Sequence, residues 1–133
     1  MNAMFVWQRN GRTVLSTPPL SGTILEGVTR DSLLELARQQ GGDIGIDEVL
    51  EEPTSIEAVR AGIEAGELRE MFACGTAAVI VPVGRLIDGD VARTVGDGEP
   101  GATTMALRSA LLDIQYGRST DTRGWMRTIE PVG

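Results

Sequence analysis

The chain has 133 residues, a length that suits one domain with its own hydrophobic core. Its formal net charge of -7 disfavours nucleic-acid and anionic-membrane partners, because such partners bind clusters of cationic side chains, and a small molecule or another protein is expected instead. All 12 basic residues are arginine, and the absence of histidine excludes a Ser-His-Asp triad within one chain.

The hydrophobic pattern predicts strands and helices in irregular alternation. In chain order these are strands over 4–8 and 12–17, a helix over 29–40, a strand over 43–50, a helix over 54–66, strands over 70–74 and 79–83, a hairpin over 85–94 and a helix over 100–116. Such an order favours an α/β or α+β domain, a sheet with about three helices packed on it.

Local signals set the expected turns and ends of these elements. Asn10-Gly11 is typical of a tight hairpin turn whose residues need positive φ, and Asp88-Gly89 is expected at the tip of the second hairpin. Gly41 is expected to end the first helix, and Thr54-Ser55-Ile56-Glu57 has the spacing of a capping box that begins the second. The strands on either side of Gly75-Thr76-Ala77-Ala78 are apolar on both faces, which predicts a central place in the sheet.

The chain shows no sequence signal for export or for a membrane span. The N-terminal residues carry no basic region followed by an apolar run, and no apolar stretch is long enough to cross a bilayer. A cytoplasmic protein with no membrane partner is therefore expected.

Two small-residue segments are candidates for anion binding. Gly27-Val28-Thr29 lies where a loop enters a helix, so unpaired N–H groups and a hydroxyl converge there. Gly75-Thr76-Ala77 interrupts two strands, where the lack of bulk lets a ligand approach backbone N–H groups. Taken alone, the first pattern is also that of an ordinary helix cap, and the second is also that of a bulge or a close packing contact.

The order of three motifs resembles a known family. "TPPLSGTILEGVTRDSLLELA", "REMFACGTAAVIVPVG" and "LLDIQYG" before a Gly-Trp tail look like the C-terminal half of branched-chain amino acid aminotransferases, which are fold-type IV enzymes that use pyridoxal 5'-phosphate. The resemblance covers residues 1–125 as one C-terminal domain and leaves 126–133 as a tail. It implies the pseudo-barrel sheet domain of that fold type, and a dimer is the habit of the family.

The resemblance also implies roles for individual residues. Leu25 packs against the pyridine ring of the cofactor, and Gly27, Val28 and Thr29 contact its phosphate through backbone N–H groups and the Thr29 hydroxyl. Gly75 and Thr76 complete the phosphate site. The N–H of Ala77 receives the α-carboxylate of the substrate. No metal site is implied.

Three departures from the family pattern affect these roles. Glu26 stands where the family usually has proline, and a carboxylate beside a phosphate site is repulsive unless it points to solvent. Ala78 and Val81 replace a Cys-x-x-Cys redox pair that some members carry, and Cys74 is expected to be a buried strand residue. The chain also lacks the lysine whose amine forms the Schiff base with the cofactor, so no catalytic residue is assigned.

The sequence therefore supports two hypotheses about function. The first is the cofactor-phosphate-binding part of an aminotransferase that, in the intact enzyme, exchanges amino groups between leucine, isoleucine or valine and 2-oxoglutarate, the chain alone being inactive. The second is a non-catalytic module that binds a phosphate-bearing ligand or a partner chain. A folded chain without any ligand is a third, plainer possibility.

In the family the lysine, a phosphate-binding arginine and a glutamate that pairs with the pyridine nitrogen all precede the matched segment. A truncated or misassigned gene, a deliberately expressed domain and a natural non-catalytic relative are all compatible with the sequence. An oligomer is expected, because apolar surface around Leu25, Val28 and Gly75 is expected to be covered by self-association.

Overall fold

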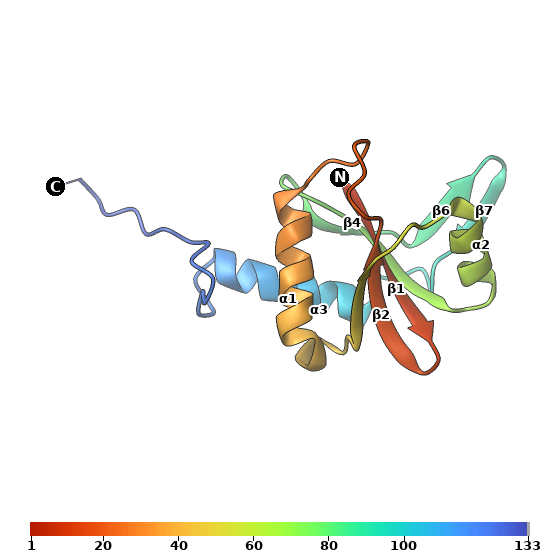
Figure 1. The fold of residues 1–133 in the computed structure, drawn as a ribbon, viewed down its shortest axis with the longest axis horizontal. Coiled ribbons are helices and arrows are strands. Elements are labelled where there is room, and N and C mark those ends of the chain that lie inside the picture. Colours follow the sequence, from red (N-terminus) through yellow and green to blue (C-terminus); the bar gives the residue numbers. More distant parts are fainter. Residues whose placement is uncertain (133) are drawn as a thin grey trace.

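A computed structural model describes residues 1–132, which form a five-stranded sheet, a separate two-stranded sheet and three helices (Figure 1). The elements are β1 (Asn2–Arg9), β2 (Arg12–Thr17), α1 (Val28–Ile44), β3 (Glu48–Glu51), α2 (Ile56–Glu64), β4 (Leu68–Gly75), β5 (Val79–Pro82), β6 (Arg85–Asp88), β7 (Val91–Thr94) and α3 (Ala102–Gln115). The large sheet has the order β3-β2-β1-β4-β5, and only the β2–β3 pair is parallel. No helix among residues 1–132 is both long and apolar enough to cross a lipid bilayer.

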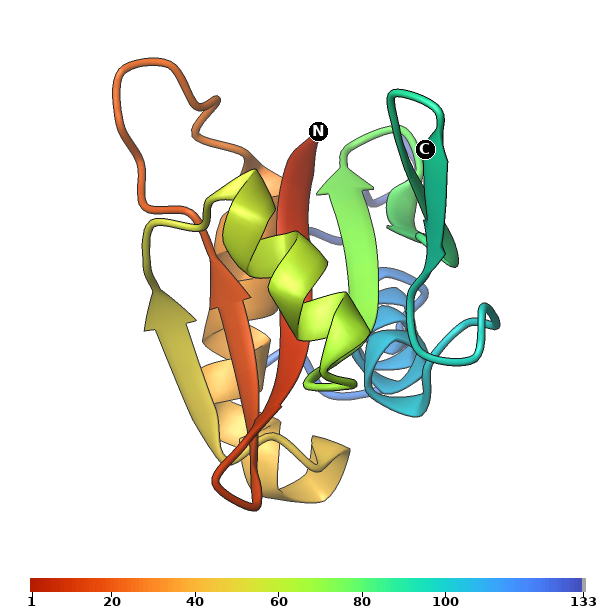
Figure 2. The same ribbon diagram turned by 90° about the vertical axis from the view of Figure 1, so that its right-hand side faces the viewer.

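The middle strand, β1, is buried on both of its faces. Met4 and Val6 point into the larger core cluster, which also holds the inward leucines of α1 and α3. Phe5 and Trp7 point to the opposite face, into a second cluster that includes Val59 of α2. Figure 2 shows α2 crossing one face of the sheet while α1 and α3 lie behind it. The sheet is therefore the middle layer between one helix and a pair of helices.

The first hairpin confirms its predicted turn. Asn10 and Gly11 have φ of 50° and 74°, and the two strands pair from Arg9 with Arg12 onward. Both central residues thus occupy the left-handed region that this tight turn requires, and the Asn-Gly pair adopts that region more easily than other residues do.

The predicted end of the first helix was wrong. The helix passes through Gly41 and ends at Gly45, whose φ of 85° and N–H bond to the Gly41 carbonyl form a left-handed cap. Ile44 consequently lies in the helix, and the next strand begins only at Glu48, not at residue 43. Gly41 is instead a packing position, because a side chain there would lie 2.7 Å from the carbonyl oxygen of Ile46.

Three further predictions needed correction. The strand β4 is interior as expected, but β5 is an edge strand, and its Val81 is exposed because nothing in the described part of the chain covers that face. The cap of α2 is Ser55, whose hydroxyl accepts the N–H of Ala58, so the helix begins one residue later than a capping box at Thr54 requires. The residues between β6 and β7 are Gly89 and Asp90, one position later than expected.

A carboxylate from the sheet caps the third helix. The residue before α3, Gly101, has no side chain to offer the first turn. Glu70 of β4 accepts the N–H groups of Thr103 and Thr104 at 3.1 and 2.7 Å, and the Thr104 hydroxyl at 2.7 Å. A side chain at position 101 would collide with this carboxyl group. Helix α3 is therefore fixed on the sheet through its positive end as well as through its apolar face.

We predict that Glu70→Ala lowers the free energy of unfolding by about 1–3 kcal/mol, because several donors at the start of α3 lose their acceptor. Glu70→Gln keeps one carbonyl oxygen and is expected to lose less. Urea unfolding followed by circular dichroism measures both changes. Glu67→Ala is the control, because Glu67 is exposed one residue before β4 begins. Equal losses for the two alanine variants would contradict a capping role for Glu70.

Candidate functional site

A hollow of about 220 Å³ lies beside the N-terminal end of β1, and we call it the cup. Its walls are the connection that enters α1 and the turn between β4 and β5, with the first two residues of the chain between them. The lining residues are Met1, Asn2, Leu25, Gly27, Thr29, Gly75, Thr76, Ala77 and Ala78. Six of the seven predicted site residues thus lie together. The fold brings two segments about 50 residues apart in sequence to one place.

The seventh predicted residue, Val28, lies outside the cup. Its side chain is 79% exposed, and it lines an adjoining hollow of about 300 Å³. Thr29 and Thr76 line both hollows, so the two are continuous along the first turn of α1. The predicted residues therefore form one surface rather than one closed pocket.

The first wall leaves the start of α1 without an internal acceptor. Gly27 caps the helix in an extended conformation and has no side chain to accept a hydrogen bond. Helix α3 receives the carboxylate of Glu70, whereas no side chain of residues 1–132 accepts a hydrogen bond from the first N–H groups of α1. The first N–H groups and the positive end of the helix dipole are therefore available to an external anion.

The second wall is a turn that carries backbone strain. Val79, at the end of this turn, has a φ of 58°, in the left-handed region where a β-branched residue is a genuine outlier. Its side chain packs against the main core cluster and lines the adjoining hollow beside Thr29 and Leu111. Such strain costs about 1–3 kcal/mol and persists only where the surrounding structure imposes it. The turn from Thr76 to Ala78 is therefore held by packing, not by local preference.

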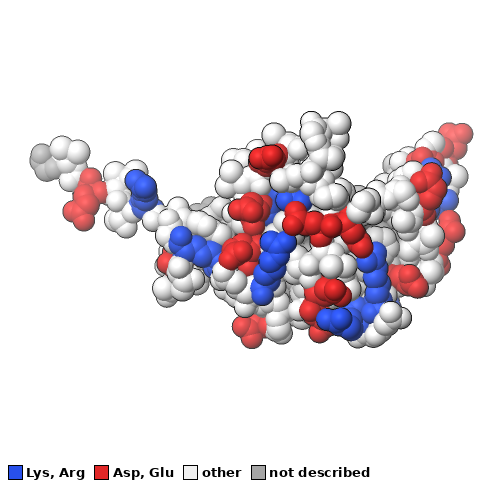
Figure 3. Space-filling view, in the orientation of Figure 1, with Lys and Arg blue, Asp and Glu red and all other residues white. Residues whose placement is uncertain are grey.

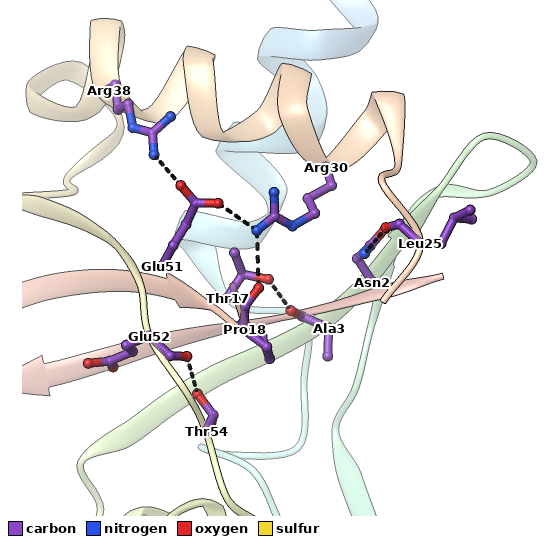
Figure 4. Close-up of polar contacts among 10 residues, drawn as sticks. All are labelled: Asn2, Ala3, Thr17, Pro18, Leu25, Arg30, Arg38, Glu51, Glu52 and Thr54. Carbon is purple, nitrogen blue, oxygen red and sulfur yellow. Dashed lines mark hydrogen bonds and ion pairs between the residues drawn. The ribbon is translucent and has the colours of Figure 1, made fainter. Parts of the chain in front are cut away.

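An ion pair between a buried arginine and a partly exposed carboxylate fixes the start of α1 to the sheet. The Arg30 guanidinium, which is almost fully buried, donates to the Pro18 carbonyl at 3.0 Å and to a Glu51 carboxylate oxygen at 2.7 Å (Figure 4). The second oxygen of Glu51 accepts from Arg38 at 3.1 Å. The hydrogen bond from Arg30, more than that from Arg38, holds the pKa of Glu51 below its usual range. This pair joins α1, β3 and the end of β2.

Arg30 and Glu51 were not among the residues predicted from the sequence. One signal was present, since an arginine in the first turn of a helix faces the positive end of the helix dipole and needs a compensating partner. Its partner lies 21 residues away in a strand that begins later than predicted, so the sequence pattern did not identify it. The Arg30 guanidinium points toward Glu51 and the Pro18 carbonyl and is not part of the lining of the cup (Figure 4).

Two residues that bear on the chemistry of the cup lie outside it. Glu26 is exposed and lines a neighbouring hollow with Leu20 and Val28, so its carboxylate is not part of the lining. Cys74 is a fully buried strand residue, as expected, and burial raises the pKa of its thiol. A raised pKa keeps the thiol protonated, which makes it a poor nucleophile.

A larger hollow than the cup lies between α2, the start of β4 and the start of α3. It measures about 460 Å³, and its acidic lining residues Glu70, Asp97 and Glu99 outnumber the one arginine, Arg69. The Glu70 carboxylate already occupies the helix end that faces this space. The smaller cup has the better donor groups for an anion, so we take it as the candidate site despite its size.

The charged surface offers no alternative basic site in the view of Figure 3, where arginines are interleaved with acidic side chains. The pairs include Arg9 with Glu52 and Arg38 with Glu51, at 2.6 and 3.1 Å. Such pairing neutralises the arginines locally. The face therefore lacks the cationic cluster that a nucleic acid requires.

The chain is similar in sequence to aminotransferases. Residues 1–86 match the family described as amino-transferase class IV. Over 126 residues the chain is 47% identical to the branched-chain-amino-acid aminotransferase of Mycolicibacterium smegmatis and 48% identical to that of Mycobacterium tuberculosis strain H37Rv. Each match covers 95% of this chain and 33% of the relative. The chain thus spans about a third of the length of these curated relatives.

Solved structures of the same enzymes share the fold. The branched-chain amino acid aminotransferase from Escherichia coli matches with a TM-score of 0.71 and 35% identity, over 93% of this chain and 36% of that one. The enzyme from Thermobaculum terrenum, described as being in its PLP-form, matches with a TM-score of 0.66 and 34% identity, over 89% of this chain and 33% of that one. The predicted family resemblance and the fold-type IV sheet domain are confirmed.

We predict that the order of stability between glycine and alanine inverts at position 79. Val79→Gly is expected to be more stable than Val79→Ala by about 1 kcal/mol, because only glycine adopts the left-handed region without steric cost. At Val14, a buried residue of β2, the alanine variant is expected to be the more stable one. Urea unfolding of the four variants measures both differences. An alanine variant at position 79 that equals or exceeds the glycine variant would contradict the strain.

We also predict that the contribution of Glu51 depends on pH. Because its pKa is lowered in the folded chain, its stabilising effect is complete above the ordinary value of 4.5 and is lost as the pH falls through the lower, folded value. Glu51→Gln is expected to cost about 1–2 kcal/mol at pH 7, a figure that allows for solvent screening of the partly exposed carboxylate.

The difference in unfolding free energy between wild type and Glu51→Gln is measured from pH 7 down to pH 3. It should shrink below pH 4.5. Glu48→Gln is the control, because Glu48 forms only an exposed pair with Arg12 at 3.5 Å and is expected to change little at any pH. If the difference in unfolding free energy between wild type and Glu51→Gln stays constant from pH 7 to pH 3, the lost charge of Glu51 is not the cause of that difference.

Proposed function

The chain belongs to the class IV aminotransferase family, and we propose that it forms the part of a branched-chain aminotransferase that binds the phosphate of pyridoxal 5'-phosphate. The observation that carries the proposal is the convergence of Gly27, Thr29, Gly75 and Thr76 on the cup, with Val28 beside it in the adjoining hollow. In the whole enzyme the reaction would transfer an amino group between leucine, isoleucine or valine and 2-oxoglutarate. The names of the relatives given above support the branched-chain amino acids, and 2-oxoglutarate follows from the family resemblance.

The donor groups of the cup fit a phosphate. N–H groups at a helix start and hydroxyl groups both donate to a phosphate dianion, and α1 together with Thr29 and Thr76 supplies both kinds. Leu25, which is 72% exposed at the rim, would present an apolar side chain to the ring. Backbone approach is possible because Gly27 and Gly75 carry no side chain toward this space. The Ala77 N–H would bind the α-carboxylate of the substrate.

The cofactor, when bound, supplies a carbonyl that condenses with amines and a ring that stabilises negative charge at the substrate Cα. In the family mechanism a lysine amine of the protein would hold the cofactor and move the proton at the substrate Cα, and this chain has no lysine. Arginine does not replace it, because a guanidinium stays protonated at any pH that proteins tolerate. We therefore propose that this chain alone binds cofactor phosphate but does not catalyse amino transfer.

The proposal includes an assembly around the cup. Leu25 and Val28 expose apolar side chains at its rim, and surface of this kind is usually covered by another subunit or segment. We propose that this surface is covered in a homodimer. We further propose that residues 1–125 form the domain, that residues 126–133 form its tail, and that the protein is cytoplasmic. Light scattering at several concentrations tests the dimer, since a constant mass of 14.2 kDa would exclude it.

A non-catalytic module is the second candidate, and the absence of lysine favours it. In that case the cup binds a phosphate-bearing ligand, or a partner chain, without chemistry. Both proposals place the ligand in the cup. They differ in whether a lysine-bearing chain joins it to allow amino transfer. Amino transfer after addition of a lysine-bearing partner chain would support the first, and binding without any such activity would support the second.

We predict that pyridoxal 5'-phosphate and inorganic phosphate bind to the chain and that Thr76→Ala weakens both about tenfold, since a hydroxyl bond to a charged group is lost. Calorimetric titration measures the affinities. Thr120→Ala is the control, because Thr120 is an exposed residue beyond α3. Equal affinities for wild type and Thr76→Ala would show that the cup is not the binding site, and amino transfer by the purified chain would refute the claim that it is inactive.

A further inference from the structure

We infer that Asn2 is a positioning residue that holds the two walls of the cup in their relative places. The inference rests on the proposed function, because it concerns how the same cup is kept in shape. Asn2 is the first residue of β1 and lines the cup. It is buried, with only 5% of its surface exposed.

The side chain of Asn2 holds the first wall. Its Nδ2 donates to the carbonyl oxygen of Leu25 at 2.9 Å (Figure 4). The N–H of Gly27 donates to the same oxygen at 2.9 Å. The carbonyl is thus fixed from two directions, one within the connection and one from the sheet. At the other end of this connection, Arg30 holds the Pro18 carbonyl. The connection between β2 and α1 is therefore anchored near both ends, and Asn2 provides the anchor beside the cup.

The backbone of Asn2 holds the second wall. In the pairing of β1 with β4, Asn2 lies opposite Cys74, which directly precedes Gly75 and Thr76 of the turn. Cys74 is fully buried, so this end of β4 is fixed in the core. One residue therefore contacts both walls, the first through its amide side chain and the second through the sheet.

The amide group also explains why one of the predicted residues is glycine. A side chain built on Gly27 would lie 2.5 Å from Oδ1 of Asn2, closer than real side-chain contacts. The space beside residue 27 is already filled by the amide. Gly27 is thus required by the packing of Asn2 as well as by the approach of a ligand to the backbone.

A simpler role for Asn2 is that of a buried polar residue whose bond stabilises the fold as a whole. Thr17 is such a residue, since its buried hydroxyl donates to the Ala3 carbonyl at 2.7 Å between two neighbouring strands (Figure 4). The bond of Asn2 differs because its acceptor belongs to the connection and not to the sheet. Loss of the Asn2 bond should loosen the connection locally, whereas loss of the Thr17 bond should weaken the fold evenly.

The first test is amide hydrogen exchange followed by mass spectrometry on the full chain. Asn2→Asp keeps the size of the side chain but replaces the donor with an acceptor, and exchange over residues 24–28 is expected to rise about tenfold while that of β1 and β4 stays unchanged. Thr17→Val is the matched control. It should raise amide exchange over residues 24–28 only as far as it lowers the free energy of unfolding of the whole chain. If Asn2→Asp does not fold, Asn2→Ala, which buries no charge, is measured instead.

Equal acceleration of residues 24–28 by the Asn2 and Thr17 variants, or none by either Asn2 variant, would overturn the inference. The second test is titration with pyridoxal 5'-phosphate, for which Asn2→Asp should weaken binding about tenfold and Thr17→Val should not. If wild type and Thr76→Ala bind this probe alike, it is the proposed function that fails, and the exchange experiment alone then decides the role of Asn2.

Discussion

The structure depends on the burial of β1 on both faces and along both edges. Its backbone pairs with β2 on one side and β4 on the other, so every helix reaches the core by packing on side chains that β1 and its neighbours present. Met4 and Val6 pack in the core cluster on one face of the sheet, and Phe5 and Trp7 pack in the cluster on the other face. Because the strand cannot shift by one residue without exchanging these two sets, its register is fixed. The position of its first residues, at the cup, is fixed with it.

The two glycine-capped helices illustrate opposite uses of the same electrostatic feature. Helix α3 receives an anion from within the fold, the carboxylate of Glu70, and this contact fastens it to the sheet. Within residues 1–132, helix α1 receives no such carboxylate from another element. Of the charged residues in its own first turn, Asp31 is exposed and Arg30 is directed away toward Glu51. The fold thus satisfies one helix terminus internally and keeps the other free. Attachment of α1 comes from an ion pair on its side, which leaves its end available for binding.

The sequence was sufficient where a signal is local. The Asn10-Gly11 turn and the inward leucines of α1 both follow from residue type and spacing. The prediction failed where the structure of a segment depends on its contacts with distant parts of the chain. Three glycines lie near the end of α1, and only the fold determines that Gly45 and not Gly41 adopts positive φ. Apolar residues on both faces of β5 suggested a central strand, because hydrophobicity alone does not distinguish burial in the sheet from a surface left open at its edge.

The same limit applies to the site. Resemblance and small residues located its walls, but the groups that hold them in place lie 21 and 23 residues from their partners and carry no pattern of their own. Pairings of this kind depend on the strand order, which the sequence does not specify directly. A polar residue at the very start of an otherwise apolar strand was the one visible indication of Asn2.

The close approach of Asn2 and Gly27 has a consequence for how the sequence can change. Each position limits the other, because any side chain at 27 needs the volume that the amide occupies, and a smaller residue at 2 releases the Leu25 carbonyl. Substitutions at the two sites should therefore be non-additive in their energies. Among related sequences, the residues at positions 2 and 27 are therefore expected to covary. A change at one position should be accompanied by a change at the other.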